Sequence, residues 1–153
     1  MQTRRIKKAD FDQIVSVIDH WWGGPIGTLA HPIFFYELGQ HALIASEETE
    51  GQMVGFLLGF VAHEPRKTGY VHLVGIHPDF RRRGVGRLLY ARFTEECARA
   101  GCDRMKAITT LGNEGSIAFH LAVGWDTQEI EDYAGVGRKR LVFTKNLNGK
   151  HLS

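Results

Sequence analysis

Apolar and polar residues repeat with two different periods along this chain, and the first part predicts a strand, a helix and an irregular stretch. Residues 4–7 have the pattern of a short strand, and Asp10 has a side chain typical of a helix N-cap. Apolar residues then recur at the spacing of one helix face as far as about residue 19. That face is predicted to hold Phe11, Ile14, Val15 and Ile18. Residues 20–39 are irregular, and His31 and Pro32 are expected to open a second short helix that ends near residue 38.

The middle of the chain alternates with the period of two that is typical of strands. Residues 41–46 and 52–63 are predicted strands, and the acidic residues 47–51 between them indicate a hairpin turn. Residues 70–77 form the next predicted strand, which Pro78 ends. Strict alternation places on one face of this strand Tyr70, His72, Val74 and Ile76, and on the other Val71, Leu73 and Gly75.

The period becomes helical again after residue 84. Residues 85–100 are a predicted helix, and Gly101 is a natural residue for its C-terminal end. Its buried stripe is expected to comprise Val85, Leu88, Leu89, Phe93 and Cys97. Residues 104–110 are then a predicted strand.

The last part of the chain predicts one more helix and a pair of strands. Asn113 can cap a helix that continues to about residue 123, where Gly124 ends it and the apolar Trp125 follows. Residues 126–132 and 139–147 are the final strands. This order of elements predicts a mixed α/β fold with strand–helix–strand crossovers late in the chain.

Composition fits one globular domain over residues 1–153. Hydrophobic residues make up 43% and charged residues 24%, both ordinary values, and no repeat or linker divides the chain. The apolar runs are too short to span a membrane, and the basic start lacks the apolar core of a secretory signal. Cys97 and Cys102 have the spacing of neither a disulfide framework nor a zinc site, so we expect free thiols in the cytoplasm. The eight histidines show no ligand spacing, which argues against a metal.

The segment 81–87, Arg-Arg-Arg-Gly-Val-Gly-Arg, predicts a pyrophosphate site. It leads from a strand into a helix, whose first backbone N–H groups lack intrahelical partners and whose dipole favours an anion. Gly84 and Gly86 permit positive φ and a close approach of a ligand to the backbone. Arg82, Arg83 and Arg87 add charge-assisted donors for phosphate oxygens.

Four other interpretations of this segment are weaker. A P-loop requires Lys followed by Ser or Thr after the glycines, and neither pair is present. The dinucleotide-binding fingerprint requires a third glycine where this chain has Leu89. A solvated basic loop is the plainest alternative. A nucleic-acid surface would need further basic residues and stacking aromatics nearby, whereas the acidic Glu95 and Glu96 lie on the adjoining helix, and a net charge of +2 gives no general case for nucleic acid.

Two motifs in order resemble those of GCN5-related N-acetyltransferases, the GNAT family. The first is Arg81-x-x-Gly84-x-Gly86 after the strand 73–78, which is similar to the family's coenzyme A loop. The second is Asn113-x-x-Ser116-x-x-Phe119-His120-x-x-x-Gly124-Trp125, which looks like its asparagine-opened helix. The two motifs cover about residues 70–126, with room between them for one helix, one strand and a loop.

The resemblance implies a mixed, mostly antiparallel sheet of six to seven strands flanked by helices and splayed at the coenzyme strand. Acetyl-CoA would be the cosubstrate, with its pantetheine arm added like a strand to the backbone of Val74, Gly75 and Ile76. The pyrophosphate would be held by residues of the loop, namely Arg81, Arg82, Arg83, Gly84, Val85, Gly86 and Arg87. Asn113 and Ser116 would contact the coenzyme, although an N-cap role for Asn113 is equally compatible with its position.

The family's chemistry implies transfer of the acetyl group to a neutral amine by direct attack, followed by protonation of the leaving thiolate. The usual acid is a tyrosine directly after the Phe119 position, where this chain has His120. Imidazole can hold or give a proton near neutral pH, so His120 is a candidate acid, or else a packed helix histidine. Candidate bases are His72 and Tyr70, because Ile108 stands where some relatives have a glutamate. A structural role for His72 stays open, and His77 is expected to be structural.

The acceptor is expected to be a primary amine of a small molecule or a peptide. Aromatic residues in the region that forms the acceptor wall could hold a cationic amine or simply form core; they are Trp21, Trp22, Phe34, Phe35, Tyr36 and Tyr133. Four isolated carboxylates could attract a cationic amine, although such surface residues usually serve only solubility; they are Asp19, Glu37, Glu131 and Asp132. A non-catalytic acyl-CoA-binding module of the same fold is the alternative function. The final strand could also pair across a homodimer.

Overall fold

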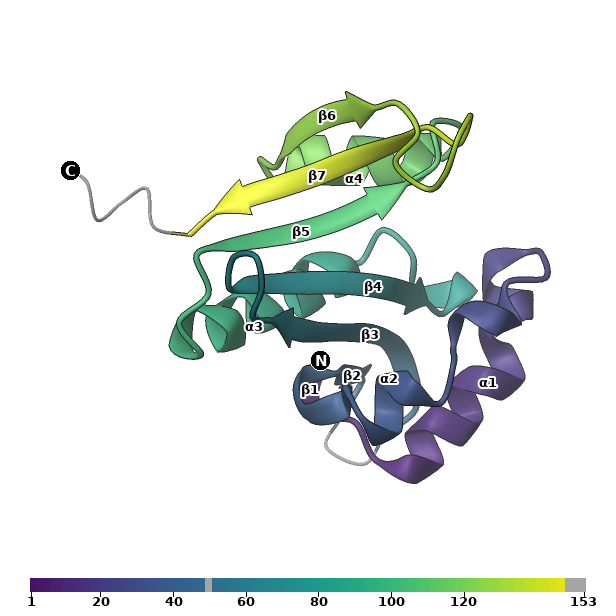
Figure 1. Ribbon diagram of the computed structural model, residues 1–153. Coiled ribbons are helices and arrows are strands. Elements are labelled where there is room, and N and C mark those ends of the chain that lie inside the picture. The colour runs from purple at the N-terminus through teal and green to yellow at the C-terminus, as the bar shows by residue number, and fades with distance from the viewer. Residues whose placement is uncertain (49–50, 148–153) are drawn as a thin grey trace.

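A single mixed sheet organises the chain in the computed structural model, which describes residues 1–48 and 51–147 (Figure 1). The sheet has seven strands in the order β1-β2-β3-β4-β5-β7-β6. They are β1 (Gln2–Arg5), β2 (Leu43–Ser46), β3 (Met53–Ala62), β4 (Thr68–Ile76), β5 (Arg104–Thr109), β6 (Asp126–Ile130) and β7 (Arg140–Asn146). Every neighbouring pair is antiparallel except β4 and β5. The predicted sheet, mostly antiparallel and of six to seven strands, is confirmed.

Helices cover both faces of the sheet and create two separate cores. Helix α1 (Lys8–Trp22) and the short α2 (Ile33–Tyr36) pack on one face, over a cluster that includes Ile14, Phe56 and Leu73. Helix α3 (Val85–Arg99) and α4 (Glu114–Ala122) pack on the other, over a cluster that includes Val71 and Phe93. We call these the α1 core and the α3 core. No helix in the described part of the chain is long and apolar enough to cross a membrane.

The sheet opens between β4 and β5. These parallel strands pair only over Thr68–Tyr70 and Arg104–Lys106, at the end where β4 begins. Beyond Tyr70, β4 continues to pair with β3 while β5 pairs with β7, and Figure 1 shows β4 and β5 separating. The later half of β4 therefore has one free backbone edge, as the predicted splay requires.

A bulge in the β3–β4 ladder changes which side chains of β4 share a face. The register shifts between Leu58 and Gly59, which pair with Leu73 and Val71, so His72 is an extra residue. As a result, Val71 belongs to the α3 core whereas Leu73 belongs to the α1 core.

The prediction of strict alternation along this strand was therefore wrong. Val74 and Ile76 pack against the α3 core, but His72 stacks on Phe34, which packs against the α1 core. The physical reason is that an added residue reverses the side-chain order of every position beyond it.

Helix α1 begins earlier and ends later than predicted. Its N-cap is Lys7, and Asp10 lies at the third helical position, where its carboxylate accepts a hydrogen bond of 2.8 Å from the Lys7 amide. The prediction of Asp10 as the N-cap was thus wrong. Asp10 lies within the first helical turn, and its carboxylate binds the backbone amide of the N-cap residue. Val15 is 49% exposed and so does not belong to the buried face. Trp21 does belong to it, which extends that face to the end of the helix. The first strand likewise lies at Gln2–Arg5 rather than at residues 4–7.

The remaining elements lie close to their predicted positions, with one difference in burial. The hairpin of β2 and β3 is confirmed, although Thr49 and Glu50 of its turn lie outside the described residues. Helix α3 ends before Gly101, which has φ +89°, as expected of a left-handed helix end. On α3, Tyr90 is buried and Leu88 only half-buried, so the predicted stripe is rotated toward α4.

Candidate functional site

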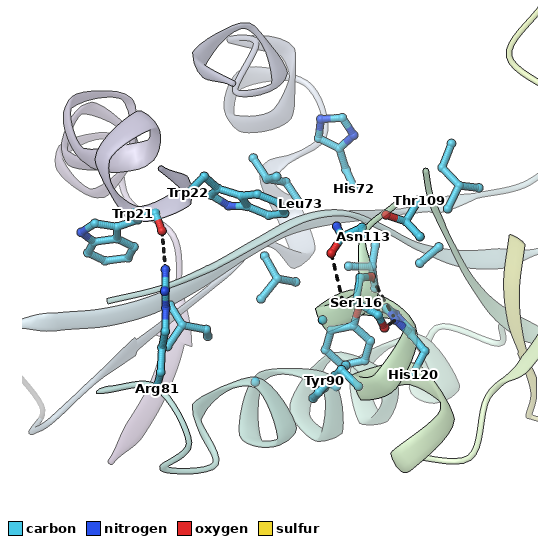
Figure 2. A pocket seen from close by; sticks show the side chains of 18 of the residues that line it. Trp21, Trp22, His72, Leu73, Arg81, Tyr90, Thr109, Asn113, Ser116 and His120 are labelled. Atoms are coloured by element: carbon cyan, nitrogen blue, oxygen red, sulfur yellow. Dashed lines mark hydrogen bonds between the residues drawn. The ribbon is translucent and has the colours of Figure 1, made fainter. Parts of the chain in front are cut away.

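A cavity of about 690 Å³ lies where β4 and β5 separate (Figure 2). Its walls come from β4, β5, the first two turns of α3 and one face of α4, and Trp21 and Trp22 at the end of α1 close it on one side. Leu73 of the α1 core and Tyr90 of the α3 core both line it, so the cavity reaches both faces of the sheet.

The loop before α3 presents backbone N–H groups at one end of this cavity. Arg82 and Gly84 have φ values of 63° and 80°, which turn the chain sharply into the helix. None of the amides of residues 81–87 donates a hydrogen bond to a group in the described part of the chain. Free amides at a helix start, together with the helix dipole, are the groups that favour an anion.

The two glycines of the loop have different roles. Gly84 is the N-cap of α3, has positive φ, and faces open space on its Cβ side. Gly86 does not have positive φ. A Cβ on Gly86 would lie 3.3 Å from the Phe119 ring, so glycine here lets α3 and α4 approach closely.

The arginines divide into those that hold the loop and those that remain available. Arg81 donates a hydrogen bond to the Trp21 carbonyl and so ties the loop to α1 (Figure 2). The Arg83 guanidinium lies 5.0 Å from the centre of the Phe80 ring. Arg82 and Arg87 are exposed and make no ion pair within the described ranges, so they can bind an external anion.

The predicted residues of β4 and α4 contribute backbone and polar groups. Val74 and Ile76 line the cavity, whereas a Cβ on Gly75 would lie 2.3 Å from the Phe56 ring on the opposite face. Asn113 caps α4 by accepting a hydrogen bond of 3.1 Å from the Ser116 amide, and both residues line the cavity. The N-cap role of Asn113 is thereby confirmed, and its side-chain nitrogen is left to donate elsewhere.

His120 is buried at the deep wall, with both ring nitrogens engaged. Nδ1 lies 2.8 Å from the Ser116 carbonyl oxygen, and Nε2 lies 2.8 Å from the Tyr90 hydroxyl. The ring stacks on Phe143 with centroids 4.0 Å apart. Burial lowers the pKa of the imidazole below its ordinary value, and the bond with Ser116 offsets this only in part. His120 is therefore a neutral, fixed side chain.

His72 lies across β4 from His120 (Figure 2). Its ring is stacked on Phe34 with centroids 3.8 Å apart, and Nε2 lies 2.7 Å from the Leu29 carbonyl oxygen. A carbonyl only accepts, so Nε2 holds the proton and Nδ1 keeps its lone pair. Burial lowers the pKa of this imidazole, which leaves it neutral near pH 7.

The other predicted candidates lie outside the cavity wall or in the packing around it. Tyr70 is not among the lining residues; it stacks on Phe60, and burial raises the pKa of its hydroxyl to about 12. His77 packs against Trp21 and accepts a hydrogen bond from the Asp79 amide, in keeping with a structural role.

Sequence reasoning missed Tyr90. The run Leu88-Leu89-Tyr90 puts three apolar residues in a row. Leu89 is buried as predicted, and the docking of α4 buries Tyr90 rather than Leu88. Within the described ranges, no Asp or Glu lines the cavity, and no cluster of three potential metal ligands was found.

Comparisons with known proteins agree with this geometry. Residues 11–125 match the model of a family described as the acetyltransferase (GNAT) family. The chain is 23% identical over 135 residues to Acetyltransferase YE1169 of Yersinia enterocolitica, covering 84% of this chain and 90% of that protein.

Two solved structures illustrate the shared fold. Naa20 of Chaetomium thermophilum in complex with a bisubstrate analogue superposes with a TM-score of 0.76 at 16% identity, covering 97% of this chain and 87% of that one. YncA of Salmonella typhimurium with its cofactor acetyl-CoA has a TM-score of 0.69 at 20% identity, with 96% and 94% coverage.

Proposed function

Because the chain belongs to the acetyltransferase (GNAT) family, we propose that it transfers an acetyl group from acetyl-CoA to a primary amine of a small molecule or peptide by direct attack. We further propose that residues 1–153 act as one N-acetyltransferase domain. The observation that carries the proposal is the opening between β4 and β5, with a loop of unpaired amides at its mouth.

The residues at this opening fit acetyl-CoA. The amides of residues 82–87, together with Arg82 and Arg87, suit a pyrophosphate. Val74, Gly75 and Ile76 pair with β3 on one side only, so their other edge can bind the amides of a pantetheine arm as a strand would. The side chains of Asn113 and Ser116 lie along the same wall.

The chain's own groups can then assist attack by an amine. Bound acetyl-CoA supplies an activated thioester. As the amine attacks, His72 accepts at Nδ1 the proton that the amine nitrogen loses. A backbone N–H on the free edge of β4 polarises the carbonyl oxygen. The nitrogen–carbon bond forms, the carbon–sulfur bond breaks, and the electron pair of that bond goes to sulfur.

Two measurements on the purified chain test this proposal. Calorimetry with coenzyme A is expected to show binding of one molecule per chain. A thiol-release assay with acetyl-CoA and a panel of small amines and peptides is expected to show release only with an accepted amine. Binding without release for every amine would favour the non-catalytic acyl-CoA-binding module. Absence of binding would refute both functions.

A further inference from the structure

Tyr90 and His120 form a hydrogen-bonded pair at the deep wall of the cavity, one from α3 and one from α4. The Tyr90 ring is 8% exposed and packs edge-on against Phe119, with centroids 4.9 Å apart. Its hydroxyl and His120 Nε2 are separated by 2.8 Å, and both residues line the cavity. Figure 2 shows the two side chains together below β4.

The hydrogen-bond partners settle where the protons of this pair lie. The Ser116 carbonyl can only accept, so His120 Nδ1 carries the proton and Nε2 has a lone pair. The Tyr90 hydroxyl therefore donates to Nε2. Stacking on Phe143 fixes the imidazole plane, and through it the position of the hydroxyl. His120 thus has no proton to offer on the side that faces Tyr90.

The hydroxyl of Tyr90 lies within one hydrogen bond of the residue at the position where the resembled family has its tyrosine acid. We propose that Tyr90 is a catalytic residue whose hydroxyl stabilises the leaving thiolate of coenzyme A, and that His120 is the residue that positions it. This inference rests on the proposed function. Stabilisation of the thiolate thus passes to Tyr90, and His120 is no longer the candidate acid.

The proposed step conserves atoms and charge. As the carbon–sulfur bond breaks, the Tyr90 O–H turns from His120 Nε2 to the sulfur. A neutral hydrogen bond is thereby exchanged for a charge-assisted one, which is about twice as strong. Burial raises the pKa of the Tyr90 hydroxyl well above its ordinary value, so the hydroxyl donates the hydrogen bond and keeps its proton. Water protonates the thiolate afterwards, and the proton from the amine leaves through His72.

The first test measures the ionisation of coenzyme A bound to the protein, which requires no acceptor amine. The ultraviolet absorbance of the thiolate is followed during a pH titration of coenzyme A on the wild type and on Tyr90→Phe. The wild type is expected to hold the thiol pKa about one unit or more below that of the variant, the shift expected of one hydrogen bond to a charged group. Tyr36 is 60% exposed and does not line the cavity, so Tyr36→Phe is expected to match the wild type.

Equal thiol pKa values in the wild type and Tyr90→Phe would overturn the role of Tyr90 and leave the proposed function intact. Failure of the wild type to bind coenzyme A would overturn both.

A swap of the hydroxyl between the two helices gives the second test. Tyr90→Phe combined with His120→Tyr removes the hydroxyl from α3 and restores it on α4, where relatives have it. This double variant is expected to recover at least half of the shift in thiol pKa and to raise kcat about tenfold above Tyr90→Phe alone. A folded double variant that binds coenzyme A with the wild-type Kd but shows no recovery would contradict the proposal.

Discussion

The two sides of the cavity present different chemical groups. On the α3 side, the entrance is formed by backbone amides and a helix N-terminus, with two available guanidinium groups beside them. On the α1 side, they are side chains, chiefly Trp22, Leu73 and the His72 ring stacked on Phe34. Binding of an anion by backbone amides requires glycine and a helix start at a fixed spacing, so it can be predicted from a sequence motif. Recognition by side chains leaves no such motif, because many residues can line such a wall.

This difference separates what is common to acetyl donors from what selects an acceptor. The α3 side has the donors that any diphosphate requires. The α1 side offers aromatic surface without a carboxylate among the described residues, so charge does not anchor a cationic amine at this wall. Substitutions in the loop before α3 and on the α1 side should therefore fail in different ways, the first in coenzyme affinity and the second in turnover.

The largest effect is expected from Gly84→Asp on the α3 side. The new carboxylate would stand at the start of α3, the proposed phosphate site, and Kd for coenzyme A should rise at least about 100-fold by calorimetry. Gly84→Ala is the matched control. Asp adopts the φ of +80° more readily than Ala does and is a better N-cap, so a larger loss with Asp identifies charge, not strain, as the cause. Tight binding by folded Gly84→Asp would contradict the assignment of the loop.

The sequence was sufficient to predict this loop because its geometry depends on local residues. A glycine N-cap, a helix stripe and adjacent arginines all lie within residues 81–97. The role of Gly86 was not predictable in the same way. Its contact with Phe119 depends on how α4 docks against α3, a packing relation between residues more than 30 positions apart.

A smaller effect is expected from His72→Ala on the α1 side. It should lower kcat/KM about 10- to 1,000-fold by thiol release with an accepted amine and leave the Kd for coenzyme A within about threefold. The imidazole accepts a proton only when neutral. Since burial lowers its pKa, the ascending limb of the wild-type pH profile should lie below pH 6.5, and the variant should lack it. His63→Ala, an exposed position, is the control, and unchanged kcat/KM in His72→Ala would remove this residue from the mechanism.

Gly75→Ala is expected to affect stability. The backbone of residue 75 faces the opening between β4 and β5, but its missing Cβ faces Phe56 at 2.3 Å in the α1 core. The added methyl group should lower the free energy of unfolding by about 1–3 kcal/mol in urea titrations. Gly115→Ala, in the first turn of α4, should instead be neutral or raise it by up to about 1 kcal/mol. Equal stability of Gly75→Ala and the wild type would show that Phe56 or the β4 backbone shifts to make room for the methyl group.

The arrangement of β4 explains why the acceptor side was predicted less well. Tyr70 to Ile76 read as a regular alternating strand, and nothing in those residues indicates an extra position. The bulge depends on how β3 pairs across Leu58 and Gly59, a relation between two strands. Tyr90 was missed for a similar reason. A single helix shows which residues are apolar, whereas the partner helix decides which of them is buried.

The smallest effect is expected from Asp10→Asn, which tests how much the ion pair at the start of α1 contributes to the free energy of unfolding. The Asp10 carboxylate binds the Arg4 guanidinium at 2.6 and 2.8 Å. Burial acts to raise the pKa of this carboxyl, but Arg4 and the Lys7 amide outweigh it, and the folded-state pKa lies below 3.8. The ionised group therefore stabilises the fold above pH 3.8, and that stabilisation is lost as the pH falls through the folded-state pKa.

Because the Arg4 side chain is 34% exposed, the variant should lose only about 1 kcal/mol at pH 7, measured by urea unfolding. The difference from the wild type should disappear in acid. A difference that persists at pH 2 would mean that the carboxylate charge is not its cause.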